Sequence, residues 1–154
     1  MQPGYTLRYA TIDDAEIMTH FRRRMFEDMN YTEYTQSAGI DACYLDWVRV
    51  GLAGGSHVAW LLVHEGQPVG STGIELSNVQ PHAVTLTTRR AHVVNVYVEP
   101  EHRRRGLARR LMQTALDWCE SEGIRVVTLQ ASDEGRPLYE SLGFKATREM
   151  ILVR

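Results

Sequence analysis

Lysine is almost absent from this chain of 154 residues: Lys145 stands alone, although lysine and arginine together number 17. Only two cysteines occur, Cys43 and Cys119, and their spacing fits neither a metal site nor a redox pair. We expect both thiols to be reduced, as in the cytosol. The formal charge is -2 at pH 7, which excludes attraction of a polyanion through the bulk field. Any basic site must therefore be local.

Long apolar runs are also missing. No stretch approaches the roughly 18 apolar residues that a membrane-spanning helix needs, and the first residues lack the basic and then apolar order of a secretion signal. No repeat, linker or low-complexity tract divides the sequence. We therefore expect a cytoplasmic protein without a membrane partner, built as a single domain over residues 1–154.

The most informative stretch runs from Ala91 to Ala108 and reads AHVVNVYVEPEHRRRGLA. A β-branched apolar run leads to a proline, then to three arginines and a glycine. Beyond it, apolar residues recur at intervals of three and four until a glycine ends the pattern: Leu107, Leu111, Ala115, Trp118, Cys119 and Gly123. This order predicts a strand, a tight turn, and an amphipathic helix that begins near Gly106.

The start of that helix carries charges of the wrong sign. A helix N-terminus presents unpaired N–H groups and favours acidic residues, yet Arg103–Arg105 precede it, and Arg109 and Arg110 follow. A phosphate ligand would supply the missing negative charge, and Gly106 allows the close backbone approach that it requires. A solvated face and a nucleic-acid patch are the alternatives. The glycine and lysine patterns of a P-loop and of a dinucleotide fold are absent.

Three segments together resemble the GNAT N-acetyltransferases. Arg103 to Ala108, RRRGLA, fits the family signature R/Q-x-x-G-x-G/A, Val96–Pro100 resembles the fourth strand, and Leu138–Phe144, LYESLGF, resembles the second coenzyme motif. The resemblance covers nearly the whole chain. It implies an α/β fold whose central mixed sheet of about six or seven strands is flanked by about four helices.

The remaining pattern predicts the other elements of such a fold. Thr11 and Asp14 form a capping pair at the start of a helix that extends to about Met29. A second helix is expected from Ile40 to about Leu52, and a short one within Gly135–Gly143. Strands are expected at Tyr5–Ala10, His57–His64, Val69–Leu76, Ala91–Val98 and Val126–Ala131, with a further extension at Val84–Thr87 and one or two strands in Phe144–Arg154.

The resemblance also implies the coenzyme contacts. The backbone of Val96, Tyr97 and Val98 would pair with the pantetheine arm of acetyl-CoA, the amides from 104 to 109 would hold the pyrophosphate, and one undetermined arginine would reach the 3'-phosphate. Ser132 stands where the family often has asparagine, which leaves one pantetheine hydrogen bond open. No metal is expected. The expected coenzyme-binding residues are Val96, Tyr97, Val98, Arg103, Arg104, Arg105, Gly106, Leu107, Ala108, Arg109, Ser132 and Tyr139.

Two residues are candidates for proton transfer. The resemblance makes Tyr139 the donor to the departing thiolate, and it places His92 where some relatives carry the base that deprotonates the amine. An exposed histidine with no role and ordered water in place of a dedicated base are the alternatives. Glu75, Asn95 and Glu99 are the other polar residues expected near the cleft.

The acceptor is expected to contact Glu27, Asp28, Tyr31 and Asn95, which favours a cationic, partly apolar amine, although a solvated loop has the same composition. The implied function is transfer of acetyl from acetyl-CoA to a primary amine of a small molecule or peptide, by direct attack in a ternary complex. A homodimer is compatible with it, and a nucleic-acid partner is not expected. The alternatives are a longer acyl donor and a non-catalytic GNAT-like module that senses coenzyme A or binds RNA.

Overall fold

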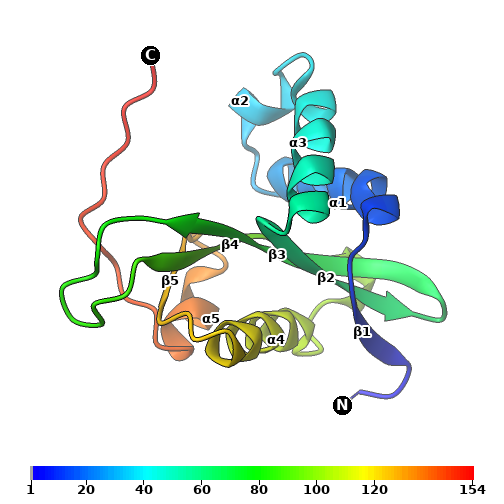
Figure 1. Cartoon of the computed structure of the whole chain (residues 1–154). Helices are drawn as coiled ribbons and strands as arrows, with labels where there is room; N and C mark the ends of the chain where they lie inside the picture. Colours follow the sequence, from blue (N-terminus) through cyan, green and yellow to red (C-terminus); the bar gives the residue numbers. More distant parts are fainter. Residues whose placement is uncertain (1) are drawn as a thin grey trace.

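The computed structural model describes residues 2–154. A five-stranded sheet in the order β1-β2-β3-β4-β5 separates two layers of helices, with α1, α2 and α3 on one face and α4 and α5 on the other (Figure 1). The strands are β1 Tyr5–Tyr9, β2 His57–His64, β3 Gln67–Asn78, β4 Arg89–Val98 and β5 Val126–Leu129. The helices are η1 Ile12–Asp14, α1 Ala15–Asp28, α2 Thr32–Thr35, α3 Ile40–Gly54, η2 Pro100–His102, α4 Leu107–Ser121 and α5 Arg136–Ser141.

The sheet is mixed, as the sequence predicts. β1 to β4 are antiparallel neighbours, whereas β4 and β5 run parallel and are connected by α4. None of the helices in residues 2–154 combines the length and apolarity that crossing a bilayer requires.

The predicted helix after the arginines is confirmed. Its buried residues follow the three- and four-residue spacing read from the sequence and pack on one face of the sheet, against Trp60, Ile74 and Val93. On the opposite face, Phe21 of α1 and Val48 of α3 pack against Leu61 and Tyr97. The predicted capping pair is also present, since the Thr11 side chain and the Asp14 carboxylate cap η1 reciprocally before α1 begins.

A bulge in β4 separates it from β5. Ser71 pairs with Tyr97 and Gly73 with Val94, so β4 contains one more residue than β3 between these pairs, and Asn95 has a φ of 56°. The parallel pairing with β5 stops at Val93. From Val94 to Val98, β4 therefore has no strand partner on that side within residues 2–154, and a wedge opens between the two strands.

Two strand predictions are wrong. Val84–Thr87 forms a turn and irregular backbone instead of a strand, with Leu86 at a φ of 60°. Phe144–Arg154 contains no strand, which leaves the sheet with five strands instead of six or seven. The apolar composition is suitable for a strand, but no described strand pairs with this segment's backbone, and pairing is what stabilises a strand. Figure 1 shows this segment, in red, leading away from the sheet.

His57 is buried without a hydrogen-bond partner. Its side chain is 2% exposed and packs edge-on against Trp47, and a Cβ placed on Gly73 would lie 2.7 Å from its Nε2. Neither ring nitrogen has a partner among the described residues. Burial lowers the pKa of His57 from 6.5 to about 4.

This burial predicts a loss of stability in mild acid. Between pH 6.5 and 4 the unfolded chain binds a proton at His57 that the folded protein does not, so the free energy of unfolding falls as pH decreases, by up to about 3 kcal/mol. In urea unfolding at several pH values, the free energy of unfolding of His57→Leu should change less with pH than that of wild type. The comparison variant is His20→Gln, which removes a histidine whose side chain is 55% exposed and lies 3.9 Å from Glu99. An unchanged slope in His57→Leu would contradict the assignment.

Candidate active site

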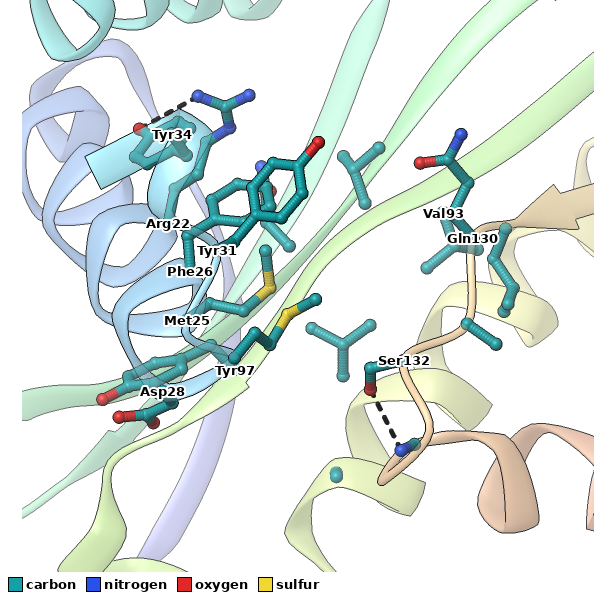
Figure 2. Close-up of a pocket in the computed structure, with 18 of the residues that line it drawn as sticks. Arg22, Met25, Phe26, Asp28, Tyr31, Tyr34, Val93, Tyr97, Gln130 and Ser132 are labelled. Carbon is teal, nitrogen blue, oxygen red and sulfur yellow. Dashed lines mark hydrogen bonds between the residues drawn. The ribbon is translucent and has the colours of Figure 1, made fainter. Parts of the chain in front are cut away.

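The wedge between β4 and β5 leads into a cavity of about 940 Å³. Residues of α1 and the following segment line one side of it, and the ends of β4 and β5 with the start of α5 line the other (Figure 2). A second cavity of about 250 Å³ lies at the start of α4. Val98, Arg103, Ala108 and Leu138 line both cavities, so the two spaces are adjacent.

The smaller cavity faces a cradle of backbone amides. Arg104 has a φ of 60° and Gly106 a φ of 73°, and such left-handed residues turn successive N–H groups inward. Within residues 2–154, no backbone N–H from 104 to 109 donates to a protein acceptor, and the first helical bond of α4 runs from Arg110 to the Gly106 carbonyl. The cradle can therefore hold an anion, because its donors are free and lie at a helix N-terminus.

The arginine side chains around this cradle differ in their partners. Arg103 donates to the Val98 carbonyl at 2.7 Å and forms an ion pair with Asp28. Arg109 donates to Ser141 Oγ at 2.6 Å. Arg104 and Arg105 are exposed and have no side-chain partner within the described part of the chain. These two are thus the freest to follow a phosphate group.

The uncovered edge of β4 presents the backbone of alternate residues. The Glu99 N–H donates a hydrogen bond to the Val69 carbonyl on β3. Because the backbone groups of alternate residues point to the same side of a strand, the N–H and C=O of Tyr97 also face β3. Val96 and Val98 face the wedge, and the Val98 carbonyl accepts the Arg103 hydrogen bond there. Of the three residues expected to pair with a pantetheine arm, Tyr97 therefore contributes its ring to the cavity and not its backbone.

Tyr139 lines the cavity from α5. Its ring packs edge-on against Phe144 at 6.2 Å, and Gly135 leaves it room, because a Cβ there would lie 2.8 Å from the ring. Burial raises the pKa of the Tyr139 hydroxyl, so this group stays protonated at neutral pH. Ser132 also lines the cavity, but its Oγ accepts a hydrogen bond from the Gly135 N–H, as Figure 2 shows.

His92 lies on the wall formed by the sheet. Its Nδ1 is 2.7 Å from Thr128 Oγ1 on β5. On β3, the residue that pairs with His92 is Glu75, which also lines the cavity. Glu75 has no ion-pair partner among the described residues. A histidine and a carboxylate, the two usual general bases, are therefore adjacent on this wall.

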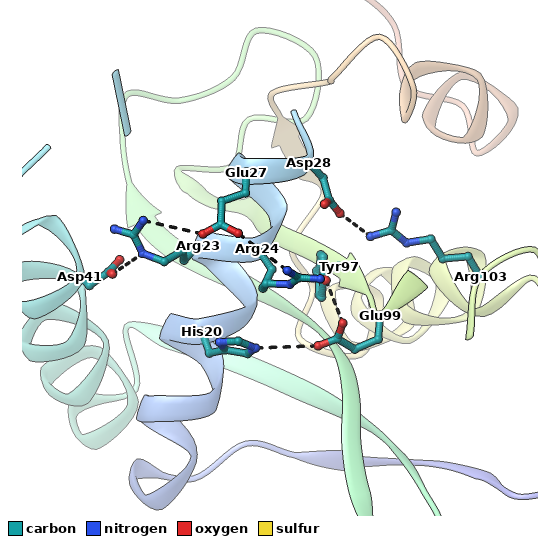
Figure 3. A network of polar contacts seen from close by, with 9 residues as sticks. All are labelled: His20, Arg23, Arg24, Glu27, Asp28, Asp41, Tyr97, Glu99 and Arg103. Carbon is teal, nitrogen blue, oxygen red and sulfur yellow. Dashed lines mark hydrogen bonds and ion pairs between the residues drawn. The ribbon is translucent and has the colours of Figure 1, made fainter. Parts of the chain in front are cut away.

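The structure brings three of the four expected acceptor contacts to the cavity: Asp28, Tyr31 and Asn95 line it, and Glu27 does not. Glu27 forms ion pairs with Arg23 and Arg24 on the outer side of α1 (Figure 3). Consecutive residues of a helix point about 100° apart, so Glu27 and Asp28 lie on different faces of α1, although the sequence pattern assigned both to the acceptor site.

Several lining residues were not anticipated. Arg22, Phe26 and Tyr44 form one corner of the cavity, and the Tyr44 hydroxyl accepts a hydrogen bond from Asn95 at 3.1 Å. The sequence contained a pattern that could have identified them: Arg22, Phe26 and Met29 are spaced by four and three residues, which places them on the same face of a helix.

The family model described as the Acetyltransferase (GNAT) family matches residues 16–144. The protein belongs to this family, and the predicted fold class is thereby confirmed. Human N-acetyltransferase 8 is 33% identical over 91 residues, which cover 57% of this chain and 38% of that protein. Glucosamine 6-phosphate N-acetyltransferase of Trypanosoma brucei brucei is 32% identical over 81 residues, or 53% of each chain. The chain thus spans 38% and 53% of these two relatives.

Solved structures share the fold along nearly the whole chain. A GCN5-related N-acetyltransferase from Ralstonia eutropha JMP134 superposes with a TM-score of 0.92 at 32% identity, over 98% of this chain and 99% of that one. A predicted acetyltransferase from Clostridium acetobutylicum, solved with acetyl-CoA, has a TM-score of 0.89 at 24% identity, over 97% and 96%. The second likeness concerns the fold alone.

Proposed function

We propose that this protein is an N-acetyltransferase that moves the acetyl group of acetyl-CoA to a primary amine, and that residues 1–154 form one such domain. One observation carries the proposal: the free amides from 104 to 109, the uncovered edge of β4 and the Tyr139 ring all border adjacent cavities. An elongated ligand with an anionic end and an amide-rich arm fits this arrangement. Family membership and the acetyl-CoA complex of the Clostridium neighbour support the same assignment.

On the donor side, the amides of residues 104–109 would hold the pyrophosphate. The backbone groups of Val96 and Val98 would form hydrogen bonds with the pantetheine amides, as they would with a neighbouring strand. Arg103 already donates a hydrogen bond to the Val98 carbonyl, so it would compete with the pantetheine for this acceptor. Ser132 retains its hydroxyl proton for one further hydrogen bond, because its oxygen is the acceptor in the contact with Gly135.

On the acceptor side, the amine nitrogen would attack the thioester carbonyl carbon in a ternary complex. The carbon–sulfur bond breaks, and the departing sulfur takes a proton from the Tyr139 hydroxyl. The proton that the amine loses would pass to His92, directly or through water, with Glu75 as the second candidate. In this role His92 donates its Nδ1 proton to Thr128, so that Nε2 is left as the acceptor.

The pH profile tests the base. Given any amine that is turned over, His92→Gln is expected to lose the acidic limb of the kcat/KM profile and about 10²-fold or more of the rate at neutral pH, because glutamine cannot take up a proton. Glu75→Gln is the matched variant across the sheet and should keep the limb. If the limb persists in His92→Gln and disappears in Glu75→Gln, the base is Glu75. If it persists in both, water accepts the proton.

The proposed activity itself is tested by incubating the protein with acetyl-CoA and a panel of amines and following release of free thiol. Turnover distinguishes an enzyme from a module that only senses coenzyme A. Absence of turnover with every amine, together with coenzyme A binding, would favour the sensor. A polarisation assay on generic RNA completes the comparison, since RNA binding through the arginines would weaken steeply with salt.

A homodimer is also part of the proposal. The surface that supports it is the C-terminal apolar run from Met150 to Val153, whose four side chains are all exposed, between 76% and 93%. Exposed apolar patches of this kind are typical of contact with another chain. Light scattering after size-exclusion chromatography measures the state directly.

A further inference from the structure

Arg22 is a cation at the acceptor end of the cavity. Its guanidinium carbon lies 5.2 Å from the ring centre of Phe26, 4.7 Å from that of Tyr34 and 4.5 Å from that of Tyr44. One nitrogen donates to the Tyr34 hydroxyl at 3.0 Å. Figure 2 shows Arg22 on α1 beside Tyr34 and Phe26, on the side of the cavity opposite Ser132.

The other arginines of α1 have acidic partners. Arg23 pairs with Asp41 and Glu27, and Arg24 pairs with Glu27, as Figure 3 shows for this side of the helix. Arg22 forms no ion pair with any of the described residues 2–154. Its charge is thus balanced by aromatic faces and one hydroxyl, in a space that is open to a ligand.

The chemistry of the guanidinium group indicates the missing partner. Arginine has five N–H donors in a planar fork, and the contact with Tyr34 occupies only one of its nitrogens. Two parallel hydrogen bonds from such a fork match a carboxylate. Arg22 is half-buried among these rings, and a charge that is screened less by water attracts an anion more strongly.

The acidic residues near this end of the cavity are already paired with arginines and are not free to bind an amine. Asp41 accepts from Arg23 and from the Tyr34 hydroxyl, and Asp28 pairs with Arg103. Two carboxylates that line the cavity have no ion-pair partner among the described residues: Glu75, on the sheet wall beside His92, and Glu134, just before α5. The cavity therefore offers a free carboxylate near the candidate base and a free cation at its α1 side.

We infer that the acceptor carries a carboxylate in addition to its amine, as an amino acid does, and that Arg22 binds this carboxylate. The inference rests on the proposed function and names the substrate class of the same site. It replaces the cationic acceptor expected from the sequence, because Glu27 and Asp28 have arginine partners in the fold, and Glu33, the other acidic residue of that segment, does not line the cavity.

Matched acceptor pairs test the inference by activity. Each L-amino acid in the thiol-release assay is compared with its amide and with the amine that lacks the carboxylate, such as phenylalanine with phenethylamine. Wild type should prefer the acids. Arg22→Gln should raise KM for the acids about 10- to 100-fold, with kcat and the KM of the neutral amines nearly unchanged, since a charged hydrogen-bonded contact is lost from binding alone.

Two further variants make the result specific. Arg24→Gln, on the same helix but outside the cavity lining, should leave both KM values unchanged. Arg22→Lys keeps the positive charge but lacks the planar fork of donors, so its KM for the acids should lie between those of wild type and Arg22→Gln. Should Arg22→Gln fail to fold, Arg22→Lys still tests the fork. Equal use of acids and neutral amines by wild type, or an equal loss for both in Arg22→Gln, would overturn the inference.

A binding measurement separates this inference from the proposed function. N-acetylphenylalanine and its amide are titrated calorimetrically into wild type and Arg22→Gln, with no turnover required. Preference of wild type for the acid, lost in Arg22→Gln, supports the carboxylate site even if no amine is acetylated. Equal affinity for acid and amide in wild type overturns it even if acetylation is observed.

Discussion

Replacement of Gly106 by glutamate is expected to weaken coenzyme A binding by about 10²-fold or more, because it places a negative charge within the amide cradle. Repulsion between like charges held at close range costs several kcal/mol, and each 1.4 kcal/mol corresponds to about a tenfold change in affinity. Gly106 has a φ of 73°, and a Cβ there would meet nothing within 4 Å, so the substitution perturbs the protein through charge and backbone conformation and not through a clash. Titration calorimetry with coenzyme A measures the effect.

The matched control lies at the other end of the same helix. Gly123 follows α4 with a φ of 71°, and a Cβ there also meets nothing within 4 Å. Gly123→Glu therefore adds the same charge and the same backbone strain, of about 1 kcal/mol, away from the cradle. Both variants should lose stability from the backbone strain, Gly123→Glu more, because a negative charge is unfavourable at the C-terminal end of a helix. Only Gly106→Glu should lose coenzyme affinity. Equal affinities in the two variants would rule out the anion site at residues 104–109.

Tyr139→Phe is expected to lower kcat by about 10²- to 10⁴-fold while leaving coenzyme affinity nearly intact, because the hydroxyl acts only when thiolate character develops. Phenylalanine retains the ring that packs against Phe144 and over Gly135. Since burial raises the pKa of Tyr139, the wild-type hydroxyl remains a proton donor throughout the neutral range. Single-turnover thiol release measures the chemical step directly.

Tyr9→Phe is the control for this substitution, because the Tyr9 side chain on β1 is 58% exposed and lies outside both cavities. It should react at the wild-type rate. A wild-type rate in Tyr139→Phe would remove the tyrosine from the mechanism, and a parallel loss of coenzyme affinity would assign it to binding instead.

The sequence predicted the strand, turn and helix around the arginines because each signal in that stretch is local. The three- and four-residue spacing of α4 depends only on neighbouring residues, and the left-handed backbone at Gly106 reflects its missing side chain. The capping pair of Thr11 and Asp14 likewise acts across three residues. These features exist in any fold that forms the helices, so no tertiary information was needed to predict them.

Contacts between distant segments were decided by the tertiary structure. The bulge at Asn95 forms between β3 and β4. Asparagine tolerates the positive φ found there, but the sequence alone does not show that the strand pairing shifts at this residue. The apolar run after Phe144 has strand composition but finds no strand to pair with in residues 2–154. A strand requires a partner for its backbone groups, which composition does not supply.

The electrostatics of the acceptor end were decided in the same way. Glu27, Asp28 and Arg22 lie on one helix, and the sequence shows their charges without showing which are neutralised. Asp28 contacts Arg103, which lies 75 residues later in the sequence, and Glu27 turns outward to Arg23 and Arg24. Arg22 has no acidic partner among the described residues and lies among aromatic rings. A charge acts on a ligand only where no protein charge opposes it, and that depends on which side chains the folded chain brings within a few ångströms.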